Sequence, residues 1–76
     1  MSDYDTGGNP SIREVLELVY DALEEKGYNG IDQLGGFLLT GDPSYITVNR
    51  NARNILMKYY DRDEYVEELL LQYFKK

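Results

Sequence analysis

The 76-residue chain contains no cysteine and no histidine. Disulfide bridges, Cys/His zinc sites, cysteine nucleophiles and Ser-His-Asp triads are therefore excluded for lack of the residues that build them. Basic residues are also scarce, because 8 Lys and Arg stand against 14 Asp and Glu, a formal net charge of −6. Non-specific nucleic-acid binding depends on basic contacts to phosphate, so this charge disfavours a nucleic-acid partner. These absences predict a protein that is not an enzyme and uses no cofactor.

Long apolar runs are missing as well. No stretch reaches the roughly 18 apolar residues of a membrane-spanning helix, and the N-terminus lacks the basic and then apolar pattern of a secretory signal. We therefore expect no membrane insertion and a cytoplasmic location. A chain of this length buries only about 60% of the surface that its unfolded form exposes, so its core should be thin.

What is present is helical periodicity after a short polar start. Residues 1–9 are mostly small or polar and predict a flexible N-terminal tail, whereas residues 10–76 predict a single domain. Apolar residues then recur every three or four positions, which predicts an all-α bundle of four short helices. The first helix should begin either after Asn9, with Pro10 at its first position, or at a capping box from Ser11 to Glu14.

Cap residues also mark the other helices. A second helix is expected over residues 30–40 and a short turn over 42–46, although the adjacent Gly35 and Gly36 weaken the helix and suggest a close approach by another helix. A third helix with a soft start should end near Tyr59, and Asp61 should cap the last one. The core face of that last helix is expected to consist of Val66, Leu69, Leu70, Tyr73 and Phe74.

Several apolar residues fall beside or behind these helical stripes. Because a small monomer has no further layer to cover them, they predict that the chain is a homodimer; scattered surface apolar residues are the alternative interpretation. The interface candidates, which include the two glycines and Phe37 of the second helix, are Leu18, Tyr20, Gly35, Gly36, Phe37, Met57, Tyr65 and Leu71.

Two clusters of charged residues are candidates for a metal site or for contact with a partner. Asp61 and Asp63 open like a calcium loop, but Val66 and Gln72 occupy the positions that should hold Gly and a bidentate carboxylate. A solvated helix face explains these acids better, and no metal site is expected. Positive charge concentrates around the third helix and either contacts an acidic partner or balances neighbouring acids. The residues concerned are Arg50, Arg53, Lys58 and Arg62.

Five blocks of the chain, at residues 19–29, 32–34, 36–46, 52–54 and 62–69, carry a resemblance to a known protein family. The most specific are Glu-Glu-Lys-Gly-Tyr-Asn at 24–29 and Gly-Asp-Pro-Ser-Tyr-Ile at 41–46. With these blocks the chain resembles the IreB family of small regulatory phosphoproteins from Gram-positive bacteria. The resemblance implies an all-helical homodimer without enzymatic activity.

The same resemblance implies a signalling role. Members are substrates of a transmembrane Ser/Thr kinase, they are phosphorylated on threonine in the N-terminal tail, and their pathway concerns cell-envelope stress and tolerance of wall-active antibiotics. Thr6 is the only threonine of the tail and is therefore the candidate phosphoacceptor. The alternative hypothesis is a constitutive assembly module that contacts a nucleic-acid-processing protein or RNA through the basic third helix.

Overall fold

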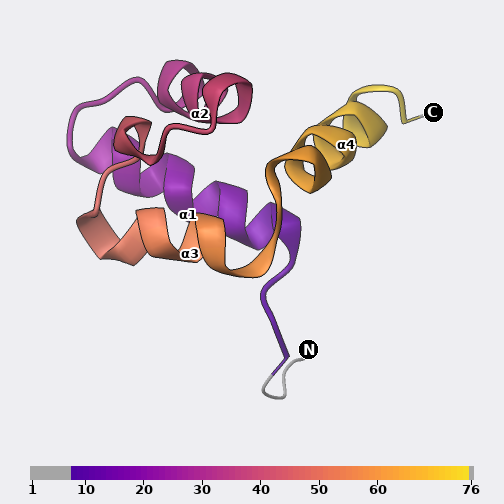
Figure 1. The fold of residues 1–76 in the computed structure, drawn as a ribbon, viewed down its shortest axis with the longest axis horizontal. Helices are drawn as coiled ribbons and strands as arrows, with labels where there is room; N and C mark the ends of the chain where they lie inside the picture. The colour runs from indigo at the N-terminus through magenta and orange to yellow at the C-terminus, as the bar shows by residue number, and fades with distance from the viewer. Residues whose placement is uncertain (1–7, 76) are drawn as a thin grey trace.

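The computed structural model describes residues 8–75. Within that range every regular element is a helix, which confirms the all-α class and the four helices (Figure 1). Two short 3₁₀ helices, η1 and η2, lie between the second and third α-helix. The bounds are α1 Ile12–Glu25, α2 Gly30–Thr40, η1 Pro43–Tyr45, η2 Asn49–Asn51, α3 Ala52–Tyr59 and α4 Arg62–Tyr73.

The start of α1 shows which of its two sequence signals is used. Ser11 is the N-cap: its hydroxyl accepts from the Glu14 backbone N–H at 3.1 Å, and the Glu14 carboxylate accepts from the Ser11 N–H at 2.8 Å. The capping box is therefore confirmed, and the start at Asn9 and Pro10 is wrong. The reason is that the reciprocal pair satisfies two backbone donors that would otherwise have no partner inside the helix.

The limits of α2 are confirmed at both ends. The Asn29 side chain accepts from the Asp32 N–H at 3.1 Å, and Gly41 ends the helix with φ +77° while its N–H donates to the Phe37 carbonyl at 2.7 Å. A residue with a Cβ is strained in that left-handed conformation, so glycine suits this position. Asp42 then accepts from the Ser44 N–H and caps η1, as expected.

The weakly marked N-terminus expected for the third helix has a structural cause. Arg50 and Asn51, which precede the helix, both have positive φ, at 54° and 60°. Non-glycine residues adopt this conformation uncommonly, asparagine more readily than most. The α-helix therefore begins only at Ala52.

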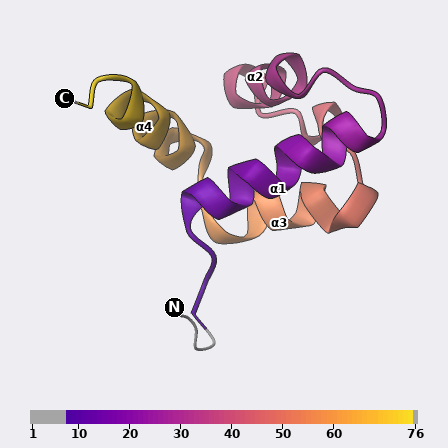
Figure 2. The ribbon, with the colours of Figure 1, turned by 180° about the vertical axis from the view of Figure 1, so that it is seen from behind.

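The core lies around α1, with α2 packed on one side and α3 on the other (Figures 1 and 2). Four of its nine buried side chains come from α1, two from α3, and one each from α2, from the residue after η1 and from α4. The buried residues are Val15, Val19, Ala22, Leu23, Phe37, Ile46, Ala52, Leu56 and Tyr65. No helix of the described part of the chain is long and apolar enough to cross a bilayer.

The last helix does not pack as its sequence predicts. In both views α4 projects away from the other three helices (Figures 1 and 2), and Tyr65 is its only buried residue. The five residues expected to form its core face are instead 39% to 80% exposed. The expected core face of α4 is therefore wrong, because only one edge of its apolar stripe meets α1 to α3.

Candidate interaction surfaces

The expected interface residues divide into three groups in the monomer. Phe37 is 4% exposed and Tyr65 is fully buried, so these two side chains belong to the core and offer no surface to a partner. Tyr20, Met57 and Leu71 are 38%, 52% and 62% exposed. The remaining three are half-buried, namely Leu18, Gly35 and Gly36. The interface role of the six outside the core stays a prediction.

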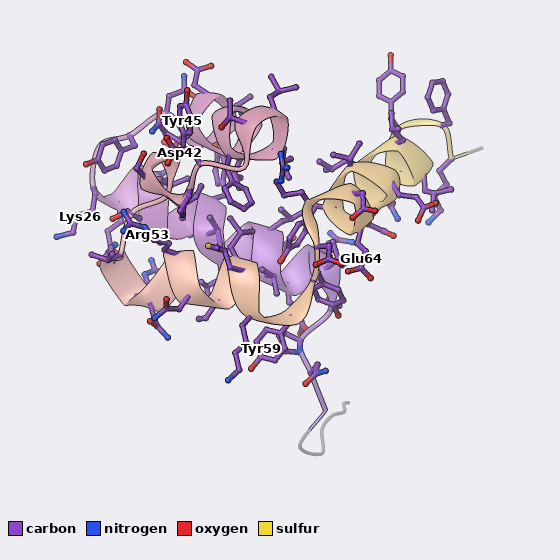
Figure 3. The ribbon with its side chains drawn as sticks, viewed as in Figure 1. Lys26, Asp42, Tyr45, Arg53, Tyr59 and Glu64 are labelled. Carbon is purple, nitrogen blue, oxygen red and sulfur yellow. The ribbon has the colours of Figure 1, made fainter. Side chains whose placement is uncertain are left out.

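The adjacent glycines of α2 face different surroundings. A Cβ added to Gly36 would lie 2.5 Å from the Tyr45 ring, so this glycine makes room for an aromatic side chain of η1. A Cβ added to Gly35 would meet nothing within 4 Å. The close neighbour expected at this pair is therefore a side chain rather than a helix backbone, and it uses only Gly36. Figure 3 shows Tyr45 beside α2.

The exposed apolar surface of α4 is a feature that the sequence-based prediction missed. We call Val66, Leu70, Tyr73 and Phe74 the α4 outer face; they are 39%, 52%, 80% and 65% exposed. At 100° per residue the full apolar stripe from Tyr65 to Phe74 covers about half of the helix circumference. A stripe that broad cannot be buried by one neighbouring layer, and its width is the signal that could have revealed the exposure.

A groove of about 630 Å³ runs between α1, α2 and α4. It is open to solvent rather than enclosed, and its floor is mainly apolar. Its lining residues are Leu16, Glu17, Tyr20, Asp21, Ile31, Leu34, Gly35, Leu38 and Leu69. The Tyr20 ring, which forms part of the wall, is held against the Gly30 backbone, where an added Cβ would lie 2.5 Å from the ring.

A second cleft lies on the other side of α4. It is lined by Leu38, Arg62, Asp63, Val66, Glu67 and Leu70, so Leu38 contributes to both hollows. The helix is therefore attached along a narrow contact with open apolar surface on each side. Arg62 fixes its start, because its guanidinium lies against Gly41 and donates to the Leu38 carbonyl at 3.1 Å.

The four basic candidates do not form one stripe on α3. Arg50 belongs to η2 and Arg62 to α4, while only Arg53 and Lys58 lie on α3. Arg53 donates to the Ile46 carbonyl at 2.8 Å, and the Lys58 ammonium lies 5.3 Å from the centre of the Tyr59 ring. Of the four cations only Arg50 contacts an acid, Glu25, so both charge balance and contact with an acidic partner stay predictions.

A salt bridge joins η2 to the end of α1. The Glu25 carboxylate accepts from the Asn49 side-chain amide at 2.8 Å and from Arg50 Nε at 3.0 Å. These hydrogen bonds, with the charge of Arg50, lower the pKa of Glu25 below its usual value. Asn49 also donates to the Ala22 carbonyl at 3.0 Å. The contact holds the left-handed turn before α3 in place.

The base of the N-terminal segment is tied to the joint between α3 and α4. The Tyr60 hydroxyl donates to the Pro10 carbonyl at 2.6 Å, and the Tyr60 ring packs edge-on against Tyr65 with centroids 5.8 Å apart. Thr6, the candidate phosphoacceptor, lies outside the described residues. Within those residues no group of three or more acidic side chains is arranged to hold a metal ion.

Comparison with known protein families gives one result that bears on these surfaces. The family model described as IreB regulatory phosphoprotein matches residues 2–75. The match covers nearly the whole chain, including all four α-helices and the segment that carries Thr6. It agrees with the resemblance carried by the sequence blocks at 24–29 and 41–46.

Proposed function

We propose that this chain, which belongs to the IreB family of regulatory phosphoproteins, is a kinase-controlled regulator that works through protein contacts. Its family is one of regulatory phosphoproteins, so the chain is not an enzyme. The family match over residues 2–75 is the observation that carries the proposal. The pathway that we assign to it is a cytoplasmic response to cell-envelope stress or wall-active antibiotics, downstream of a membrane Ser/Thr kinase.

Thr6 is the proposed phosphoacceptor. A phosphate would add a charge of about −1.5 to −2 to a segment that already holds Asp3 and Asp5. Four residues further on, the Pro10 carbonyl is bound by Tyr60. A modification at Thr6 is therefore made on a short segment whose base is attached to the α3–α4 joint.

The test is phosphorylation of the full chain by the cognate kinase, followed by fragmentation mass spectrometry. We expect one phosphate, located on Thr6 and lost in Thr6→Ala, whereas Ser2→Ala serves as the matched control and retains it. Absence of phosphate from the wild-type chain, or its retention in Thr6→Ala, would contradict the assignment of Thr6.

The proposed regulator is a homodimer, and we place its interface on the α4 outer face. Support comes from the exposure of Val66 and Leu70, which border the cleft beside Leu38. An isologous contact between two α4 helices would cover both copies of this face at once. A thin core gains stability when association buries additional apolar surface.

Sedimentation equilibrium with two charge-introducing variants tests this interface. Leu70 on α4 and Met57 on α3 are both 52% exposed, so Leu70→Arg and Met57→Arg are a matched pair. We expect Leu70→Arg to produce the 8.8 kDa monomer and Met57→Arg, at the competing interface candidate on α3, to remain dimeric. Dissociation by Met57→Arg alone would move the interface to α3, and a monomeric wild type would remove the dimer.

A further inference from the structure

The groove between α1, α2 and α4 has a chemistry of its own. We propose that it binds an amphipathic helical segment of a partner protein, one that presents bulky apolar side chains next to Lys or Arg. The inference rests on the proposed function only in that the chain acts through protein contacts. It adds the chemical class of the partner, and it depends neither on Thr6 nor on the α4 outer face.

The apolar part of the argument is the groove's floor. Leu16 from α1, Leu34 from α2 and Leu69 from α4 line it together, and Ile31 at its edge is 70% exposed. Gly35 leaves the floor open, because a Cβ there would have no atom within 4 Å. A volume of about 630 Å³ is large enough for several bulky side chains. Helices that bind such grooves insert anchors from one face, spaced three or four residues apart.

The charge of the lining selects among possible occupants. Glu17 and Asp21, one helical turn apart on α1, are the only charged residues among those that line the groove. Arg13 contacts Glu17 at 3.1 Å, but it is not part of the lining. An acidic border beside an apolar floor complements a segment that carries Lys or Arg next to its apolar anchors.

The same charges disfavour a second copy of this chain as the occupant. The apolar residues of α4 are interleaved with Asp63, Glu64, Glu67 and Glu68, so an inserted α4 would bring acids towards Glu17 and Asp21. Like charges placed opposite each other weaken an association, and the net charge of −6 adds to this repulsion. We therefore expect the groove to bind a basic partner segment and the α4 outer face to bind a second copy of the chain.

The first experiment selects ligands for the full chain from a display library of random peptides about four helical turns long. We expect enriched peptides to carry two or more bulky apolar residues at helical spacing together with net positive charge. Enrichment of acidic peptides, or no enrichment, would overturn the proposal.

The second experiment measures binding of the best enriched peptide by fluorescence anisotropy. Gly35→Leu fills the floor and should weaken binding about tenfold or more, while Gly35→Ala, which adds one methyl group, should have a smaller effect. Circular dichroism checks that both variants remain helical. Unchanged affinity in Gly35→Leu would place the peptide elsewhere and overturn the assignment of the groove.

Charge variants separate the two sides of α4. Glu17→Gln with Asp21→Asn should weaken peptide binding about threefold to tenfold and reduce its salt dependence. Asp63→Asn with Glu67→Gln removes two acids from the opposite cleft and should leave affinity unchanged. If instead no peptide binds and Gly35→Leu turns a dimer into a monomer, the occupant is a second copy. None of these results bears on whether Thr6 is phosphorylated. The proposed groove and the proposed phosphorylation can therefore be disproved independently of each other.

Discussion

The first and last α-helices of this protein have similar lengths and similar shares of apolar residues, yet they are used differently. α1 buries Val15, Val19, Ala22 and Leu23, whereas α4 buries only Tyr65. The difference lies in their neighbours, since α1 has α2 on one side and α3 on the other, and α4 meets α2 along a narrow contact. An amphipathic pattern therefore shows which face of a helix can be buried, but the burial itself requires a partner surface.

The comparison has a functional meaning. The part of the molecule built around α1 provides the stable framework, and α4 provides apolar surface that a partner can cover. Monomeric proteins rarely keep several neighbouring large apolar side chains exposed unless that surface is used for binding. In the proposed function, this exposed surface makes the protein contacts through which the regulator acts.

The largest expected effect separates the core of α1 from the surface of α4. Leu23→Ala should lower the free energy of unfolding by about 2–5 kcal/mol, because it leaves a cavity in the core. Leu70→Ala, at a residue that is 52% exposed, should change it by about 0.5 kcal/mol or less. Urea denaturation of both variants at low protein concentration measures the two values. A loss at Leu70 that grows with protein concentration would show that a second copy covers α4.

A smaller effect is expected at the one buried contact of α4. The Tyr65 hydroxyl donates at 2.5 Å to the carbonyl of Leu56, in the last turn of α3, where carbonyls lack partners within the helix. Tyr65→Phe should therefore lower the free energy of unfolding by about 1–3 kcal/mol near neutral pH. Tyr73→Phe, at a residue that is 80% exposed, is the matched control and should have no such effect.

The same pair of variants gives a pH dependence. Burial, with smaller contributions from Tyr60 and Glu64, raises the pKa of Tyr65 to about 12. Because the unfolded chain loses this proton near pH 10, it binds fewer protons than the folded chain between about pH 10 and pH 12. Wild-type stability should fall across that range, and its advantage over Tyr65→Phe should shrink. A constant difference in unfolding free energy from pH 9 to pH 11 (roughly spanning the onset of ionisation) would contradict the burial of this phenol.

The smallest expected effects come from the two glycines of α2. Gly36→Ala should lower the unfolding free energy by about 1 kcal/mol, since crowding against Tyr45 outweighs the gain in helix propensity. Gly35→Ala should raise it by up to about 1 kcal/mol, because its Cβ enters open space on the α4 side. Thermal unfolding of the two single variants compares them directly. If both variants changed the unfolding free energy in the same direction, the difference in packing at Gly35 and Gly36 would be contradicted.

Local signals made the helix limits predictable. The caps at Asn29, Gly41 and Asp42 were all correct, because each depends on backbone groups no more than four residues away. At α1 two local signals competed, and the reciprocal pair of Ser11 and Glu14 was the one used. Contacts between distant segments were not predictable in this way. The hydrogen bonds from Asn49 to Ala22 and Glu25 span more than twenty residues, and they accompany the left-handed turn that delays α3.

For the candidate surfaces, too, local pattern was informative and contacts between distant segments were not predictable. Met57 and Leu71 were expected outside the core and are exposed, whereas Tyr65 was expected on the flank of its helix and is fully buried. The periodicity of α4 is compatible with burial anywhere along a stripe that covers half of the helix. Only the position of α4 against the other helices, with Tyr65 meeting Leu56 of α3 and Tyr60, decides that the Tyr65 edge is the one that enters the core.

Composition and local pattern are enough to establish the helical class, most helix limits, the acidic charge, the lack of residues for Cys/His metal sites, disulfides and triads, and the family. Each of these depends on composition, on order along the chain or on contacts within one helical turn. Only the tertiary structure decided which face of α4 is buried, which glycine of α2 receives a ring, and that a groove with an acidic border lies between α1, α2 and α4. The physical reason is that burial depends on surfaces brought together from distant parts of the chain. Helical periodicity does not specify which surfaces those are.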